Sequence, residues 1–447
     1  MRRATTLLWA LLIATAMAAQ AQTPREELRA DATRSASNFA AYPGPGSKAL
    51  TPAPKGMKAV YLSHYGRHGS RYMSKTKEYD HLFDVLDKAR RLDKLSPLGL
   101  DVLGRVERIR READNRTGEL TPLGVAQHRE IARRMTERYP ELLGNRHAEV
   151  LAQSTLAVRC ILSMHAALME LQRLNPRLSV SADAGIRQQH YMNFTDRQLI
   201  KNITTIDSRQ CFSDLCLRHL CWQRPVGQLF SDTAYVAQAV DGERLNYYLF
   251  RMASNVQNME LRDSLTLYDL FTPDELYHNW LMNNAFWFLG YGRTPLTGSL
   301  QPYTQRHLLR QIVSDADSCL RLPHPAASLR FGHDTVLLPL VCLLDVDGYG
   351  QSIGSLDSLE ARGWVDYRVF PMAGNLQLVF YRHPRHHGSD GVLVKVLLNE
   401  REATLPLTPV TGPYYRWADV RRYCLQLLSR FDSAEENTLA NRSIATD

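Results

Sequence analysis

The sequence predicts an α/β fold, with a central, mostly parallel sheet flanked by helices and a second, mainly helical domain. Two observations predict it. Short β-like runs recur along the chain, and each is followed by a turn and a helical pattern, as in parallel strands joined by helices. Residues near 191–322 instead look mostly helical and are rich in aromatic side chains, as in "TPDELYHNWLMNNAFWFLGYG".

The first unit is "KAVYL", a short β-like run that starts at Lys58. The segment "SHYGRHGSR" follows it directly, so we expect Arg67, His68 and Arg71 at the carboxyl end of a strand. The second unit, "AEVLAQSTLAVRCILSMHAALMEL", reads as a strand and then a helix. Ser154 is its expected N-cap, which places Arg159 in the early turns of that helix.

The third unit is "ASLRFGHDTVLLPLVCLL". It predicts a strand through Phe331, a turn at Gly332–His333, and a helix with Asp334 at its start. In open α/β sheets, ligands bind beyond the carboxyl ends of the strands. The three units would therefore deliver His68, Arg159 and Asp334 to one crevice.

The remaining elements complete the fold. The segment "GELTPLGVAQHREIARRMTERYPELL" predicts a helix that Thr121 caps, with Pro122 at its first position. The chain returns to strands in "NLQLVFYR" and "GVLVKVLLNE". We expect an N-terminal arm over residues 22–50, an α/β catalytic domain over 51–190 and 323–447, and a helical cap domain over 191–322.

The first 21 residues resemble a secretory signal peptide. Arg2 and Arg3 precede an apolar run, and the small residues Ala19 and Ala21 suit cleavage before Gln22. We therefore expect an exported protein, periplasmic or secreted, with no membrane span. The net charge of +8 is scattered over 447 residues, so we expect no nucleic-acid partner. A small acidic partner fits this charge as well.

The chain has seven cysteines, and this odd number leaves at least one thiol free or paired outside the chain. The spacing in "CFSDLCLRHLCW" is wider than in usual zinc pairs. An exported chain can form disulfides in this segment, but the sequence leaves the pairing open. Cys160 and Cys342 lie in apolar runs that predict core positions.

An imidazole between two arginines has a physical consequence. Like charges lower the pKa of His68, so its ring stays neutral and nucleophilic. Arginine forks match the oxygens of a phosphate monoester, and Arg67, Arg71 and Arg159 together can surround its non-bridging oxygens. His68 would attack phosphorus, and Asp334 would protonate the leaving group. No carboxylate-and-histidine set has two-metal spacing, so we expect no metal and no cofactor.

These motifs resemble the histidine acid phosphatases, the branch of the histidine phosphatase superfamily that includes phytases and inositol polyphosphate phosphatases. "RHGSR" matches the Arg-His-Gly-x-Arg signature of this family. "GELTPLGVAQHREIARRMTERY", "STLAVRCILSMHAAL" and "GHDT" match its later blocks in order. The resemblance runs from about Tyr61 to Leu425.

The resemblance implies a role for each matched residue. His68 would be the nucleophile that forms a phosphohistidine, and Asp334 the proton donor. Arg67, Arg71, Arg159 and His333 would bind phosphate. The resemblance also implies that the helical domain lies over the active-site cleft.

The substrate expected from this resemblance is an inositol polyphosphate such as phytate. Ser74 and Lys75 stand where the phytases carry a Thr-Lys pair that contacts phosphate. The "HD" at 333–334 is the acid-phosphatase form of the donor, whereas many inositol polyphosphate phosphatases carry His-Ala-Glu. A broad acid or sugar phosphatase, and a phosphate-ester binding protein without turnover, therefore stay open as alternatives, and so does the oligomeric state.

Two further motifs are interpreted as loops. "RHHGSDG" at 385–391 lies between two strand-like runs, which predicts a hairpin loop. "GQSIG" at 350–354 matches the Gly-x-Ser-x-Gly elbow of serine hydrolases. That elbow needs a preceding strand, whereas "DVDGYG" supplies a turn here, so Ser352 is not expected to be a nucleophile.

Overall fold

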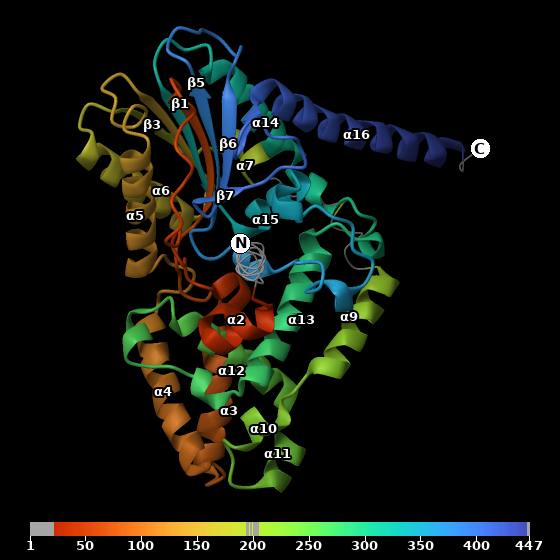
Figure 1. Cartoon of the computed structure of the whole chain (residues 1–447). Helices are drawn as coiled ribbons and strands as arrows, with labels where there is room; N and C mark the ends of the chain where they lie inside the picture. The colour runs from red at the N-terminus through yellow and green to blue at the C-terminus, as the bar shows by residue number, and fades with distance from the viewer. Residues whose placement is uncertain (1–21, 194–195, 197–198, 200–204, 445–447) are drawn as a thin grey trace, which may run out of the picture.

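Eight strands form one mixed sheet in the computed structural model, which describes residues 22–193, 196, 199 and 205–444 (Figure 1). The predicted signal peptide of residues 1–21 lies outside the described residues. The strands are β1 Lys58–Arg67, β2 Glu149–Ser154, β3 Ser179–Asp183, β4 Ala326–Gly332, β5 Asn375–Arg382, β6 Leu393–Leu398, β7 Arg401–Ala403 and β8 Tyr414–Arg416.

The sheet order is β3-β2-β4-β1-β5-β6-β7, with β8 paired to β6. Strands β3, β2, β4 and β1 are mutually parallel, and the neighbours from β1 onward are antiparallel. Every residue of β4 is buried, as expected of a parallel strand covered on both faces. The predicted α/β fold with a central, mostly parallel sheet flanked by helices is confirmed. The antiparallel neighbours from β1 onward make the sheet mixed.

The parallel pairing brings three carboxyl strand ends to the same edge. β4 lies between β1 and β2, and the register pairs Arg67 with Gly332 and Ser154 with Phe331. The chain segments that leave these strands therefore start side by side. This is the convergence that the sequence predicts for His68, Arg159 and Asp334.

Helices cover both faces of the sheet. The longer helices of the described chain are α2 Pro24–Ala30, α3 Lys77–Arg91, α4 Pro97–Ala113, α5 Pro122–Arg138, α6 Val158–Leu174, α9 Ile206–His219, α11 Thr233–Ala239, α12 Gly242–Val256, α13 Pro273–Tyr291, α14 Arg306–Cys319, α15 Asp334–Leu343 and α16 Trp417–Ile444, and the shorter ones include α7 Gln189–Met192 and α10 Gln223–Gly227. Helices α5 and α6 pack with Leu62 and Leu329 in one core. Helices α14, α15 and α16 pack with Tyr61 and Tyr65 on the other face. The predicted cap of α5 is confirmed, because the Thr121 hydroxyl accepts from the Gly124 amide.

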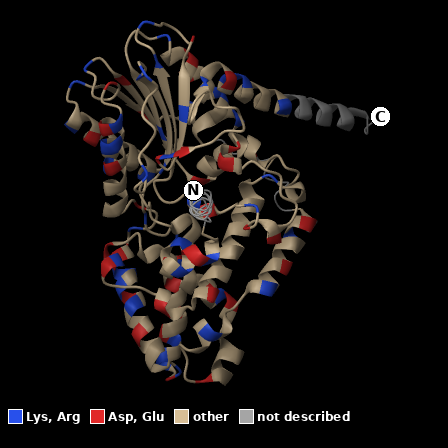
Figure 2. Ribbon diagram, viewed as in Figure 1, with Lys and Arg blue, Asp and Glu red and all other residues tan. Residues whose placement is uncertain are grey.

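A second, helical part lies below the sheet in Figure 1. Its core joins α3 and α4 to α10, α12 and α13, so residues 77–113 share a core with residues 226–280. Chain segments far apart in sequence thus build this part together, and the proposed division of the chain into domains stays a prediction. Figure 2 shows basic and acidic residues interspersed along the ribbon of both parts.

One local expectation is wrong. Ser154 ends β2 rather than capping a helix, because α6 begins at Val158 with Ala157 as an N-cap that makes no side-chain bond.

Residues 22–50, the predicted N-terminal arm, are partly helical. They contain α2 and the 3₁₀ helix η1 Ala32–Phe39, whose Phe39 is buried in the core of the helical part.

The cysteines of the chain, all within the described residues, are free thiols, so no disulfide links Cys211, Cys216 and Cys221. Cys160 and Cys342 are buried, as predicted. Over residues 22–193, 196, 199 and 205–444, no helix combines the length and apolar character that a membrane crossing requires.

His64 in the middle of β1 makes stability depend on pH. Burial lowers the pKa of its ring from 6.5 to about 3. Between those values the unfolded chain binds a proton that the folded chain excludes, so the free energy of unfolding rises with pH. One such group contributes about 1.4 kcal/mol per pH unit.

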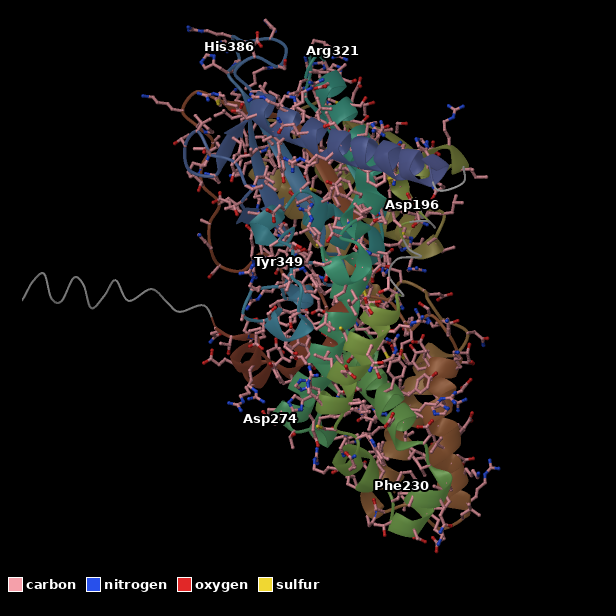
Figure 3. All side chains as sticks on the ribbon, turned by 90° about the vertical axis from the view of Figure 1, so that its right-hand side faces the viewer. Asp196, Phe230, Asp274, Arg321, Tyr349 and His386 are labelled. Atoms are coloured by element: carbon pink, nitrogen blue, oxygen red, sulfur yellow. The ribbon has the colours of Figure 1, made fainter. Side chains whose placement is uncertain are left out.

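We predict that His64→Leu reduces the slope of the unfolding free energy against pH by about 1.4 kcal/mol per unit between pH 4 and 6. Urea unfolding at a series of pH values measures this slope. His386→Leu is the control, because its ring is exposed on the β5–β6 loop (Figure 3). An unchanged slope in His64→Leu would contradict the prediction.

Candidate active site

The arginine–histidine segment is fixed by backbone hydrogen bonds from two sides. The Arg67 amide donates to the Gly374 carbonyl at 2.8 Å, and the His68 amide to the Gly332 carbonyl at 2.9 Å. The Ala373 amide donates back to the His68 carbonyl at 2.9 Å. The backbone at His68 is therefore held between β4 and the loop that leads into β5.

Gly69 lets two helices approach this segment. A Cβ atom at Gly69 would lie 2.4 Å from the Gly124 carbonyl oxygen at the start of α5, too close for any larger residue without a shift. From α6, the Ser163 hydroxyl accepts from the Gly69 amide at 3.1 Å. The glycine of the motif is thus required by close packing.

The His68 ring is set for nucleophilic attack. Its Nδ1 lies 2.9 Å from the Gly69 carbonyl oxygen, which can only accept, so Nδ1 carries the proton and Nε2 keeps its lone pair. Burial and then the charges of Arg67, Arg71 and Arg159 hold the pKa of His68 well below its usual value. The ring therefore stays neutral even in mildly acidic conditions.

The arginines around His68 have hydrogen-bonding capacity that the described protein atoms do not use. Arg67 is fully buried, and its Nη1 donates to the Phe370 carbonyl at 2.6 Å. Arg71 Nη1 donates to the Tyr72 carbonyl at 2.8 Å. Within the described part of the chain, the buried Nε groups of Arg67, Arg71 and Arg159 have no hydrogen-bond partner. Such donors fit an anion with several acceptor oxygens.

His333 stands opposite the presumed nucleophile. The ring centroids of His68 and His333 are 5.8 Å apart, and the Thr155 hydroxyl lies 3.1 Å from His333 Nε2. Burial, followed by the charge of Arg159, lowers the pKa of His333 to about 4. A neutral ring at this place can donate one hydrogen bond to an anion without adding charge beside His68.

Asp334 begins α15 and pairs with Arg67. Its Oδ2 lies 2.8 Å from Arg67 Nη2, and its Oδ1 accepts from the Thr335 amide at 2.9 Å. Burial raises the pKa of Asp334, but Arg67, Arg71 and His333 together lower it further, so the carboxyl group is ionised in the free protein. To donate a proton, it must gain one when an anion offsets the arginine charges.

A polar network behind the motif has no signature in the sequence. The Ser70 hydroxyl donates to Asn258 Oδ1 at 2.7 Å, and its amide donates to Gln127 Oε1 at 2.8 Å. Asn255 Nδ2 donates to the Arg71 carbonyl at 3.0 Å. These amides come from α5, from the end of α12 and from the turn after it, so both parts of the molecule support the motif.

The structure separates the weaker candidates from this site or places them at its rim. Ser74 and Lys75 are exposed on the segment between β1 and α3, and the Lys75 amide donates to Glu78 Oε2 at 3.1 Å. Ser352 is exposed in a loop without a preceding strand, so the expectation that it is no nucleophile agrees with the structure. His386 lies in the hairpin loop after β5, at the edge of the sheet opposite to His68.

Among the described residues, no group of three or more His, Cys, Asp or Glu side chains is arranged to hold a metal ion. The groups that meet at His68 are instead hydrogen-bond donors and positive charges. Their chemistry fits a phosphate ester.

Comparison with known proteins gives a consistent result. Residues 236–399, which include His333 and Asp334, match the model of the histidine phosphatase superfamily (branch 2). No curated protein matches the chain by sequence. The predicted resemblance to this superfamily is confirmed over the matched residues.

Solved structures share the fold over most of the chain. The Bifidobacterium longum multiple inositol polyphosphate phosphatase in complex with phosphate is 16% identical, with a TM-score of 0.70 over 87% of this chain and 97% of that chain. The phytase from D. castellii is 12% identical, with a TM-score of 0.64 over 92% of this chain and 89% of that chain. The fold and the family match support the predicted class, a phosphomonoester hydrolase.

The contact between Gly69 and α5 yields a prediction for the site. Gly69→Ala should lower the free energy of unfolding by about 1–3 kcal/mol, because its Cβ overlaps the backbone of Gly124. Gly104→Ala on α4 is the matched control, since a Cβ there meets no atom within 4 Å and alanine favours the helix by about 0.5–1 kcal/mol. Denaturant unfolding measures both variants, and an equal response would show that Gly69 is not required by packing.

Proposed function

We propose that this protein is an exported acid phosphomonoesterase that hydrolyses inositol polyphosphates, such as phytate, through a phosphohistidine intermediate. One observation carries this proposal: a neutral His68, with Nε2 free, lies among three arginines that keep unpartnered donors. The substrate class is supported by the solved structures with this fold, one of which is the Bifidobacterium longum enzyme in complex with inositol hexasulfate. Export is supported by the leader-like residues 1–21.

The first half-reaction transfers the phosphoryl group to His68. Nε2 forms a bond to phosphorus while the bond between phosphorus and the ester oxygen breaks. The arginines stabilise the charge on the non-bridging oxygens as it redistributes in the transition state. Asp334 gives its proton to the departing oxygen, so an alcohol leaves instead of an alkoxide.

The second half-reaction restores the enzyme. Water attacks phosphorus, the bond between phosphorus and Nε2 breaks, and the Asp334 carboxylate takes one proton from the water. Inorganic phosphate leaves, and His68 is again neutral with the proton on Nδ1. The same carboxyl group thus acts as acid in the first step and as base in the second.

The pKa directions favour catalysis under acidic conditions. His68 stays unprotonated because its pKa lies well below the usual value. Asp334 must start protonated, although Arg67 and Arg71 lower its pKa. A phosphate dianion that engages these arginines raises the pKa of Asp334 again, and a low external pH supplies the proton.

The roles proposed for His68 and Asp334 lead to different predictions. His68→Ala should abolish hydrolysis without unfolding the protein, and an alkaline quench with labelled substrate should trap label on His68 of the wild type. Asp334→Asn should slow hydrolysis of alkyl phosphates by about 10²–10⁴-fold. It should slow an aryl phosphate less, because an aryl oxide leaves with less need for a proton.

Ser352→Ala is the control for this experiment and should be fully active, since Ser352 lies in an exposed loop outside the site. Label on Ser352 would overturn the mechanism. An equal loss on both types of ester would remove Asp334 from the donor role. A panel of phytate, sugar phosphates and an aryl phosphate across pH tests the substrate, and preference for simple monophosphates at every pH would favour a broad acid phosphatase.

We place Lys75 at the rim of the proposed active site, where it should favour substrates that carry several phosphate groups. Its side chain is exposed. In the proposed mechanism three arginines hold the scissile phosphate, which leaves Lys75 for another group. It can reach a neighbouring phosphate, where a partly desolvated ion pair is worth more than the 0–1 kcal/mol or so of an exposed one. Lys75→Ala should raise the Michaelis constant for phytate several-fold and affect an aryl monophosphate much less. An equal effect on both would instead assign Lys75 a general structural role.

A further inference from the structure

Helix α12 reaches the arginine–histidine segment with more than Asn255. Asn255 Nδ2 donates to the Arg71 carbonyl at 3.0 Å, so this face of α12 lies against the segment. Arg251 precedes Asn255 by one helical turn and therefore shares that face. Arg251 is thus placed beside the predicted phosphate ligand Arg71 by geometry.

Aromatic rings and one carboxylate surround Arg251. Its guanidinium carbon lies 4.8 Å from the ring centroid of Phe39 and 5.4 Å from that of Tyr247. The guanidinium carbon of Arg71 lies 5.4 Å from the centroid of the same Phe39 ring. Arginines from α12 and from the segment after β1 therefore share one aromatic platform.

Glu78 connects this platform to the rim. Its Oε1 accepts from Nε of Arg251 at 3.0 Å and also from Nη2, while its Oε2 accepts from the Lys75 amide at 3.1 Å. The fork to Glu78 uses Nε and Nη2 and leaves the two N–H groups of Nη1 outside it. The side chain of Arg251 is 22% exposed, so a solute can reach it.

We propose that Arg251 binds a second phosphate group of a polyphosphorylated substrate, next to the group held at His68. This inference rests on the proposed function and names a specificity residue for it. A monophosphate held by Arg67, Arg71 and Arg159 leaves no phosphate group for Arg251. An inositol ring with several phosphates would place a second phosphate group there, between Lys75 and the ring of Phe39.

Glu78 has two opposing effects in this arrangement. The two hydrogen bonds that its Oε1 accepts fix the direction of the Arg251 side chain, which reduces the conformational entropy lost on binding. Its negative charge also faces the same region and repels a polyanion. Glu78→Gln removes this repulsion and keeps an oxygen that can accept from Arg251, so it should strengthen the binding of a polyphosphate.

The test measures kcat and KM for inositol hexakisphosphate and for an aryl monophosphate with purified full-length variants. Arg251→Gln should raise KM for the hexakisphosphate by about tenfold, which corresponds to about 1.4 kcal/mol, and should affect the aryl phosphate far less. Glu78→Gln should lower KM for the hexakisphosphate. Arg244→Gln is the matched control, because Arg244 also lies over a ring on α12 but is exposed near the start of the helix.

Loss of Arg251 alone leaves Glu78 buried without its partner, which can destabilise the fold. The double variant Glu78→Gln with Arg251→Gln avoids this charge, and its KM should exceed that of Glu78→Gln by the same tenfold. An unchanged KM for the hexakisphosphate, or an equal change for both substrates, would overturn the role of Arg251. Failure of the wild type to hydrolyse the hexakisphosphate would instead refute the proposed substrate, and aryl phosphate hydrolysis would still report the reaction.

Discussion

The parallel pairing of β1 with β4 is the constraint on which the site depends. It sets the end of one strand against the end of the other, so that the His68 amide bonds the Gly332 carbonyl and Arg67 meets Asp334 at 2.8 Å. β2 joins on the other side of β4 and delivers α6 with Arg159. A shift of one residue in this register would point alternate side chains to the opposite face of the sheet and separate these groups.

The same pairing concentrates positive charge in a region from which water is largely excluded. Burial, and then the charge of Arg67, lowers the pKa of Arg71 to about 10, which shows how unfavourable its cation is there. Asp334 is the carboxylate that pairs with Arg67. Removing charges from water costs free energy unless partners compensate. In the proposed function a bound phosphate supplies the compensating charge, and the fold would hold in advance the charges that the transition state requires.

Local patterns explain why much of the site could be predicted from the sequence. His68, Arg159 and Asp334 each follow a strand and precede or begin a helix. In parallel strand–helix units such residues lie at the carboxyl ends of the strands, so their common place at one edge of the sheet could be predicted. The prediction for Ser154 was wrong for a local reason. A serine before a helical pattern is typical of an N-cap, but here Ser154 is the last residue of β2, and α6 starts after Ala157. The limits of a strand and the start of a helix depend on pairing partners that the local sequence does not contain.

Contacts between distant segments could not be predicted. Asn255 and Asn258 lie more than 180 residues from the motif they support, and an amide on a helix gives no sign of its partner. The packing of α3 and α4 with α12 and α13 is equally hidden, because an apolar helix face fits any complementary surface. The residues before Phe39 are mostly small or polar, and they give no sign that its ring is buried in the core of the helical part beside Arg71 and Arg251.

A low pH should favour the proposed reaction at the site, but it lowers the stability of the folded core. The buried rings of His128 and His333 have pKa values lowered to about 4, so the folded state excludes protons that the unfolded chain binds below pH 6.5, and acid weakens the fold. The proposed reaction, in contrast, needs a proton on Asp334, whose pKa Arg67 and Arg71 lower. In that proposal a polyanionic substrate reconciles these demands, because its charge offsets the arginines and raises the pKa of Asp334, while its binding stabilises the folded state by mass action. The substrate, rather than the free protein, would thus make the proton available at a pH that the core tolerates.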